Sequence, residues 1–336
     1  MDPSGMLEVM LGLPGQVREG FALARPRLDV ALPESILVLG MGGSAIGGDL
    51  LSSILSEKGG PPVMVNRDFV LPGHVRRETL VFAVSYSGNT AETLSASAEA
   101  EKRGCEVVTI SSGGALGRWH GGKGHVRLPA GYQPRAALAL MLMPMLGVLD
   151  DLGAADFGPE AEECTRVLAR MRGGLCPENA APKNAAKAVA SSFHGAFPTV
   201  LSGTRLAPAA RRWRTQLNEN AKVLSRDEVL PEMDHNDLVA WAADPMASNC
   251  AVVLLRDRNE DPRLARRFEL TRRLGLHRAR SVLEVRSRGR SALARLLSCV
   301  FVGDLASLYL AVLRGVDPTP VEVIERMKRE LEGNGP

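Results

Sequence analysis

Short apolar runs alternate with helical stretches along almost the whole chain of 336 residues. The run Ser35–Leu39, for example, ends in a glycine-rich turn and is followed by the helical pattern of Ala45–Leu55. Strands that alternate with helices in this way are typical of parallel βαβ units, in which helices cover both faces of the sheet. The sequence therefore predicts an α/β fold. The strands expected in the first half are Ser35–Leu39, Pro62–Val65, Leu80–Val84, Glu106–Ile110 and His125–Leu128.

The same rhythm restarts after a stretch rich in Gly, Pro and acidic residues. We expect a first domain at residues 1–152, a linker region at 153–182 and a second domain at 183–336, a length that suits two ordinary domains. The strands expected in the second half are Phe197–Ser202, Ala251–Arg256 and Ser281–Val285. The other helices expected in the chain are Leu7–Ala24, Ala91–Arg103, Pro134–Leu152, Glu160–Arg172, Pro208–Leu224, Pro262–Leu274, Ser291–Arg314 and Pro318–Leu331.

The composition excludes several classes of protein. The chain carries 41 Lys and Arg against 38 Asp and Glu, and basic runs such as Arg211-Arg212-Trp213-Arg214 are short and expected on a helix surface, so we expect no nucleic-acid partner. The apolar segment Ala136–Leu149 is too short to cross a membrane and is expected to be a buried helix. Five widely spaced cysteines without a CxxC pair indicate reduced thiols. Because no signal-peptide pattern is visible, we expect a cytoplasmic protein without a membrane partner.

A glycine-rich turn, Gly40–Gly48, follows the first strand and opens a helix. Glycines let the backbone approach a ligand closely, and a helix N-terminus offers free N–H groups to an anion. One interpretation is a nicotinamide dinucleotide site, which also needs an acidic residue after the second strand. The best-placed residue there is Asn66, which disfavours this interpretation. Another interpretation is a turn needed only for strand–helix packing.

Hydroxyl side chains follow the third strand, in the run Ser85-Tyr86-Ser87-Gly88-Asn89-Thr90 that precedes a helix. Three Ser or Thr hydroxyls beside a helix N-terminus form a cradle of neutral donors that suits a phosphomonoester. Alternatively, Thr90 caps the helix and the other hydroxyls contact solvent. Because one hydroxyl is enough for a cap, the pattern favours phosphate binding by Ser85, Ser87 and Thr90. In the phosphosugar hypothesis that follows, we expect Ser44 and the backbone of Gly43 to bind the phosphate as well.

The two loops, GMGGSA and SYSGNTAET, resemble the sugar isomerase (SIS) domain, a five-stranded parallel α/β module that binds phosphosugars. Together with four further motifs, they are similar to the bifunctional phosphoglucose/phosphomannose isomerases of archaea and some bacteria, from about residue 30 to about residue 330. The resemblance implies two SIS-type domains, each a flavodoxin-like three-layer sandwich with a parallel sheet. The further motifs are Pro134–Ala137, Asn218–Lys222, Leu230–Asn236 and Gly315–Pro320.

The resemblance also implies a reaction, the interconversion of glucose 6-phosphate, and also mannose 6-phosphate, with fructose 6-phosphate through a cis-enediol. Glu219 would be the base that moves the proton, and Arg135 would stabilise the enediolate charge. His235 would open the sugar ring from the other subunit, which implies a homodimer. Lys328 would be a second polar group near the ring. No step needs a metal or another cofactor.

Each of these side chains also has an ordinary interpretation. The run Asn218-Glu219-Asn220 is unfavourable in a helix and asks for a reason, but a solvent-facing turn would provide one. A histidine in a loop is usually a surface residue, and Lys328 stands in a basic helix end. Arg135 would be an exposed first-turn residue, although a cation there is unfavourable for the helix dipole.

The preferred sugar epimer is less clearly indicated than the reaction. Some family members carry a threonine seven residues before the lysine, and Val321 stands at that position here. This departure weakens the expectation for mannose 6-phosphate more than that for glucose 6-phosphate. A different class of function is a non-catalytic SIS module that senses a phosphosugar. Such a module needs the hydroxyl loop but has no need of Glu219, Arg135 and His235 together.

Overall fold

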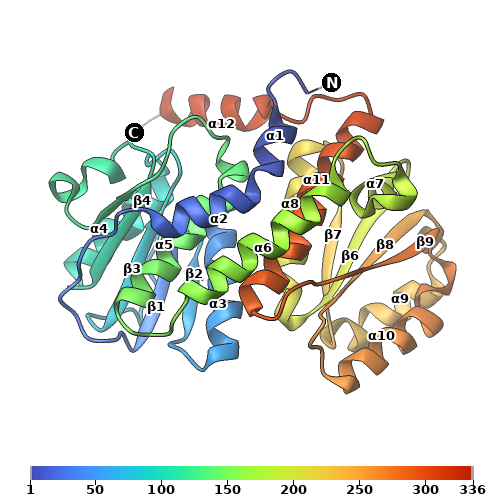
Figure 1. Ribbon diagram of the computed structural model, residues 1–336, viewed down its shortest axis with the longest axis horizontal. Helices are drawn as coiled ribbons and strands as arrows, with labels where there is room; N and C mark the ends of the chain where they lie inside the picture. The colour runs from blue at the N-terminus through green and yellow to red at the C-terminus, as the bar shows by residue number, and fades with distance from the viewer. Residues whose placement is uncertain (1, 334–336) are drawn as a thin grey trace.

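A parallel sheet of five strands forms the N-terminal half of the molecule (Figure 1). The computed structural model describes residues 2–333, without the side chains of His120 and Glu332. The strand order β2-β1-β3-β4-β5 places β1 beside β3, although β2 lies between them in the sequence. The strands are β1 (Ser35–Leu39), β2 (Val63–Asn66), β3 (Thr79–Val84), β4 (Glu106–Ser111) and β5 (His125–Arg127).

The second sheet has four parallel strands in the order β7-β6-β8-β9. All the predicted strands are present, with ends that differ by a residue or two, and β7 was not predicted. The two parallel sheets with their flanking helices confirm the predicted α/β class. The strands are β6 (Phe197–Gly203), β7 (Arg226–Leu230), β8 (Cys250–Arg256) and β9 (Ser281–Arg286).

Helices cover both faces of each sheet (Figure 1). The helices of the first half are α1 (Met6–Leu11), α2 (Leu13–Ala22), α3 (Gly42–Lys58), α4 (Ala91–Lys102), α5 (Leu138–Asp151) and α6 (Gly158–Leu175). Those of the second half are α7 (Ala185–Phe193), α8 (Ala207–Asn220), α9 (Asp237–Ala243), α10 (Pro262–Leu274), α11 (Ala292–Leu313) and α12 (Glu322–Gly333).

Side chains of each strand alternate between two apolar layers, as the period of a strand requires. In β1, Ile36 and Val38 belong to the large central cluster, whereas Leu37 and Leu39 pack with α4 on the outer face. In β8, Val253 joins the same central cluster, and its neighbours pack with α10 on the other side. The inner faces of both sheets therefore contribute to a single interior.

That interior is built from α3, α5, α8 and α11, which pack between the two sheets. The predicted buried helix corresponds to α5, where every residue from Leu138 to Leu149 is buried. Helix α11 has the length and hydropathy of a membrane span, but 89% of its most apolar window is buried inside the protein. We therefore interpret α11 as a core helix.

Several predicted helices have different ends. The expected helix at Leu7–Ala24 is two helices that meet at Gly12, with Pro14 in the first turn of the second. Helix α8 ends at Asn220 and not at Leu224, because Lys222 has a φ of 54°, which is not helical. Helix α12 begins at Glu322 and not at residue 318, after a segment in which two prolines lack N–H donors.

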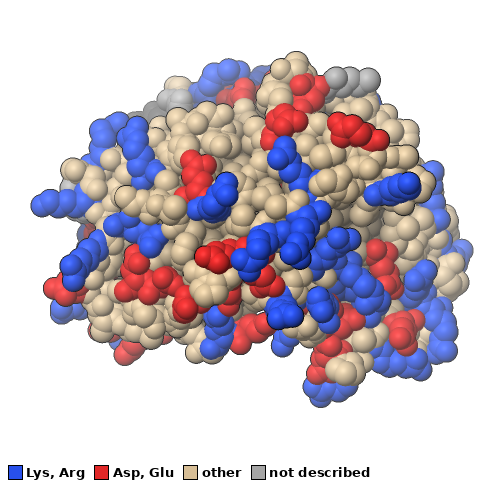
Figure 2. Space-filling view, in the orientation of Figure 1, with Lys and Arg blue, Asp and Glu red and all other residues tan. Residues whose placement is uncertain are grey.

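The run Arg211-Arg212-Trp213-Arg214 was predicted to lie on the surface, and for its two central residues this was wrong. Arg212 is buried against Asp304 of α11, and the indole of Trp213 donates to the carbonyl of Cys299 at 2.9 Å. Because α8 lies between a sheet and α11, the residues on one side of this helix are buried even when they are polar or charged. On the face of the molecule shown in Figure 2, acidic and basic side chains are interspersed.

The region expected to be a linker is largely helical. Helix α6 packs against α2 of the first half and against α11 of the second (Figure 1). The domain ends at residues 152 and 183 remain a prediction.

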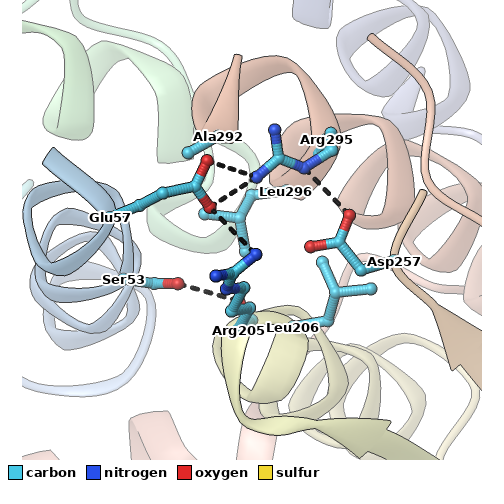
Figure 3. A pocket seen from close by; sticks show the side chains of 8 residues that line it. All are labelled: Ser53, Glu57, Arg205, Leu206, Asp257, Ala292, Arg295 and Leu296. Atoms are coloured by element: carbon cyan, nitrogen blue, oxygen red, sulfur yellow. Dashed lines mark hydrogen bonds and ion pairs between the residues drawn. The ribbon is translucent and has the colours of Figure 1, made fainter. Parts of the chain in front are cut away.

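A cluster of charged side chains also joins the two halves (Figure 3). Arg295 of α11 donates to Glu57 of α3 at 2.7 Å, and its Nε lies 2.9 Å from the carboxylate of Asp257, which follows β8. Beside them, the hydroxyl of Ser53 donates to the carbonyl of Arg205 at 2.8 Å. The halves are thus connected by ionic contacts as well as by apolar packing.

Replacing Gly303 with alanine is expected to destabilise the fold by about 1–3 kcal/mol. A Cβ atom at this position of α11 would lie 2.1 Å from Nε1 of Trp213, so the indole would have to move out of its pocket. Urea unfolding measures the effect. Gly173→Ala in α6 is the matched control, because a Cβ there meets nothing within 4 Å. Equal stability of the two variants would contradict the packing argument.

Candidate active site

The glycine-rich turn lies at the carboxyl end of β1, where α3 begins at Gly42. A Cβ atom on Gly43 would lie 3.3 Å from Cα of Arg135, so glycine allows these two backbones to approach closely. The hydroxyl of Ser44 is buried and donates to the sulfur of Met141 at 3.3 Å. The structure therefore places Gly43 at the edge of the candidate site, with the Ser44 hydroxyl directed into the core.

The hydroxyl loop follows β3, and its side chains converge. Ser85 Oγ lies 2.8 Å from Thr90 Oγ1 and 3.5 Å from Ser87 Oγ. Backbone N–H groups of Gly88 and Asn89 donate to the Ser85 and Ser87 hydroxyls at 3.2 and 3.3 Å. Thr90 is the N-cap residue of α4, but its side chain makes no capping hydrogen bond. The hydroxyls of this loop are thus gathered around one point, an arrangement that suits an anion.

The two loops are neighbours because their strands pair. Leu39 at the end of β1 is in register with Ala83 of β3, so the turn after each strand opens at the same edge of the sheet. The chain crosses from β2 on one side of β1 to β3 on the other side. Ligands of open α/β sheets bind in the crevice at such a reversal.

Arg135 lies beside the glycine-rich turn, in the short 3₁₀ turn η2 (Pro134–Ala136) that precedes α5. Its side chain is only 4% exposed. Nε donates to the side chain of Asn220 at 2.8 Å, and one terminal nitrogen donates to the carbonyls of Pro318 and Thr319 at 2.9 and 2.7 Å. Burial lowers the pKa of the guanidinium, and Glu219 opposes that shift. An arginine keeps its charge in proteins, so the site holds a fixed cation.

Glu219 is in the last turn of α8, and its Oε2 lies 3.8 Å from the other terminal nitrogen of Arg135. The carboxylate is 28% exposed and can be reached from solvent. The next residue, Asn220, is buried, and it also donates to the hydroxyl of Ser307 at 2.9 Å. The polar run Asn218-Glu219-Asn220 therefore has a structural reason: Asn220 orients the side chain of Arg135, while the carboxylate of Glu219 remains accessible to solvent.

His235 and Lys328 lie on the surface of the chain. His235 is exposed at the end of the 3₁₀ turn η5 (Glu232–His235), and Lys328 is exposed on α12. In the part of the chain that the structure describes, no hydrogen bond or ion pair joins either of them to Arg135 or Glu219. Within one chain, the structure brings together Gly43, Arg135 and Glu219, and the strand that precedes Gly43 pairs with the strand that precedes the hydroxyl loop.

Sequence reasoning missed three residues that support Arg135 and Glu219. Arg212 donates to the carbonyl of Arg135 at 2.8 Å, Asn220 accepts from the guanidinium, and Lys222 lies one turn beyond Glu219. A signal for the first two exists, because Arg212, Gln216 and Asn220 recur every four residues on the buried side of α8. Because Arg212 is charged, it was assigned to the surface, and the spacing was not recognised as that of a buried face.

Two family models match parts of this chain, one in each half. Residues 31–116 match the model of the SIS domain, and residues 182–331 match that of the bacterial phospho-glucose isomerase C-terminal SIS domain. A bifunctional phosphoglucose/phosphomannose isomerase from Caldicellulosiruptor bescii is 36% identical, over 97% of this chain and 98% of the relative. Another from Aquifex aeolicus is 34% identical, over 90% of this chain and 92% of the relative.

Among solved structures, a glucose-6-phosphate isomerase-like protein from Thermus thermophilus has the same fold, with a TM-score of 0.61 and 21% identity. The superposition covers 95% of this chain and 94% of that one. Relatives above 30% identity that match nearly end to end share their family with this chain. With its ordered motifs and its two parallel sheets, the chain belongs to the family of bifunctional phosphoglucose/phosphomannose isomerases.

Proposed function

We propose that the protein is an aldose–ketose isomerase that interconverts glucose 6-phosphate, and also mannose 6-phosphate, with fructose 6-phosphate. The observation that carries this proposal is the pair of Arg135 and Glu219, whose charged groups lie 3.8 Å apart, with the backbone of Arg135 close to Gly43 of the glycine-rich turn. A buried cation, an accessible carboxylate and a cradle for an anion are the groups that this reaction needs. The relatives named above support the choice of substrate.

In this mechanism the carboxylate of Glu219 takes the proton from the carbon beside the carbonyl and returns it to the former carbonyl carbon. The hydroxyl proton passes from one oxygen of the enediol to the other, so that the carbonyl and hydroxyl groups exchange places. Arg135 stabilises the negative charge of the enediolate, because its guanidinium is already oriented and needs no rearrangement. Ser85, Ser87 and Thr90 bind the phosphate together with the backbone at Gly43. The role predicted for Ser44 remains a proposal, and its hydroxyl would have to turn away from Met141 to fill it.

The proposal extends to a homodimer in which His235 opens the sugar ring in the partner's site. Two observations support it. His235 is exposed and separate from Arg135 in its own chain, and α12, which carries Lys328, exposes apolar side chains. Apolar residues gathered on one helix are typical of a contact surface. They are Val323, Ile324, Met327 and Leu331.

The remaining parts of the proposal rest on the sequence and on the family. We place the enzyme in the cytoplasm and assign it no metal and no other cofactor. Val321 lies directly after the segment whose carbonyls hold Arg135, so the residue that differs from some family members is close to the site. The epimer preference is for this reason the part of the proposal that most needs a measurement.

The test is to incubate the chelator-treated protein with fructose 6-phosphate in heavy water and to follow the products by NMR. We expect glucose 6-phosphate, with mannose 6-phosphate at a lower rate, and deuterium at C2 of the products. Unphosphorylated fructose is the control substrate, and it should react far more slowly because it lacks the group that the hydroxyl loop binds. Binding of fructose 6-phosphate without interconversion or exchange would favour a non-catalytic phosphosugar sensor.

A further inference from the structure

Lys222 has a backbone conformation that is rare for its residue type. Its φ of 54° makes it the sole non-glycine residue with positive φ in residues 2–333. It lies two residues beyond the last residue of α8, where helices commonly end with glycine in this left-handed conformation. A bulky residue there is unfavourable, and such outliers are found preferentially at functional sites. The side chain therefore needs an explanation.

The ammonium group of Lys222 contacts backbone carbonyl groups. It donates to the carbonyl of Glu219, to that of Pro320 at 2.8 Å and to that of Pro318 at 3.3 Å. The first of these carbonyls lies in the last turn of α8, where a cation is favourable for the helix dipole. The other two belong to the segment Pro318-Thr319-Pro320, which we name the proline segment.

The proline segment also holds Arg135. Pro318 and Thr319 are buried, and their carbonyls accept from the same terminal nitrogen of Arg135 at 2.9 and 2.7 Å. The carbonyl of Pro318 is thus shared by Arg135 and Lys222. The two prolines of the proline segment have no N–H groups, so the segment has few hydrogen-bond donors with which to bind α8. Lys222 supplies the missing donors from the helix side.

These hydrogen bonds connect Lys222, through the proline segment, to the proposed catalytic pair of Arg135 and Glu219. Lys222 fixes the proline segment to the end of α8, and the segment fixes one terminal nitrogen of Arg135. The other terminal nitrogen of Arg135 then faces Glu219, which belongs to the same helix end as Lys222. Burial and the nearby charge of Arg135 lower the pKa of Lys222, in keeping with two cations held close together.

We infer that Lys222 is a positioning residue for catalysis, which orients the guanidinium of Arg135 toward Glu219 through the proline segment. The inference rests on the proposed isomerase function and adds to it a residue with no assigned role. Lys222 touches no reacting atom in this scheme. Because Lys222 affects how Arg135 is oriented toward the transition state, its replacement should change kcat more than KM.

The test uses Lys222→Gly, because glycine keeps the left-handed backbone while the whole side chain, with its ammonium group, is removed. We expect kcat with fructose 6-phosphate to fall at least fivefold, KM to change less than twofold, and Lys222→Arg to restore part of the loss. Lys187→Ala is the matched control. The ammonium of Lys187 also donates to a proline carbonyl, that of Pro177, but this contact does not involve Arg135, and its loss should leave kcat unchanged.

Two further measurements separate positioning from a merely structural role. In an Arg135→Lys background, which loses the paired donation to the proline segment, adding Lys222→Gly should lower kcat by less than twofold further. Hydrogen exchange of residues 318–324 should be faster in Lys222→Gly than in the unchanged protein. This second readout does not depend on catalysis.

The outcomes distinguish a failure of the proposed isomerase function from a failure of the positioning role inferred for Lys222. If the unchanged protein does not interconvert sugar phosphates, the proposed function fails, and faster exchange still shows that Lys222 holds the segment. If exchange at residues 318–324 is unchanged in Lys222→Gly, the inference is overturned whatever the activity. Full kcat in Lys222→Gly, or a loss that adds completely to that of Arg135→Lys, would also overturn it.

Discussion

Replacing Glu219 with glutamine is expected to lower kcat for fructose 6-phosphate by about 10²–10⁴-fold. An amide has nearly the shape of the carboxylate but cannot accept the proton from carbon. The side chain is partly exposed at the end of α8 and contacts Arg135 at 3.8 Å, so little of the fold depends on its charge. Steady-state rates and deuterium incorporation at C2 should fall together, while the free energy of unfolding stays nearly constant.

The control for this substitution is Glu228→Gln. Glu228 lies on the edge strand β7 and forms an ion pair with Arg226 at 3.1 Å, in a region of the second sheet without contact to Arg135. Its replacement should leave kcat unchanged. Full activity in Glu219→Gln would remove the base from the proposed mechanism, but the isomerase itself would still stand.

Replacing Asp304 with alanine is expected to destabilise the protein by about 3–5 kcal/mol. Asp304 and Arg212 are both buried, and the guanidinium donates two hydrogen bonds to the carboxylate, at 2.9 and 2.7 Å. Burial raises the pKa of Asp304, and Arg212 opposes that shift. Removal of the carboxylate leaves the cation of Arg212 in the interior without its partner. Urea unfolding measures the loss.

Two variants test the reason for this loss. Glu162→Ala breaks the exposed pair between Glu162 and Arg166 on α6, where about 0–1 kcal/mol is expected. The double variant Arg212→Met with Asp304→Leu replaces both charges by apolar groups and should recover much of the stability lost in Asp304→Ala. A loss in Asp304→Ala as small as that in Glu162→Ala would contradict the view that the buried charge is responsible.

The fold was largely predictable because buried strands can be recognised by their runs of apolar residues. The strand Thr79–Val84 is buried throughout and apolar from Leu80 onward, as expected of a parallel strand with helices on both faces. The exception is β7, with the sequence Arg-Asp-Glu-Val-Leu. An edge strand is only half covered, and Asp227 of this strand pairs with Arg214 of α8, so polar side chains are compatible with it.

Without the family resemblance, the candidate site was predictable only where the residues that form it are adjacent in the sequence. The hydroxyl loop is one continuous segment, and its convergence follows from its own turn. The burial of Arg135 instead depends on carbonyls 183 and 184 residues away, at Pro318 and Thr319. The run at Arg211 was misplaced for a related reason, since the partner of Arg212 is 92 residues further along the chain.

The continuous interior between the two sheets also determines how Arg135 and Glu219, the proposed catalytic pair, are brought together. Arg135 precedes α5 in the first half and Glu219 ends α8 in the second, and α3 packs against both of these helices. Domains that share a large apolar contact do not rotate against each other. Folding therefore sets the separation of Arg135 and Glu219, the cation and the base of the proposed mechanism, before any substrate binds.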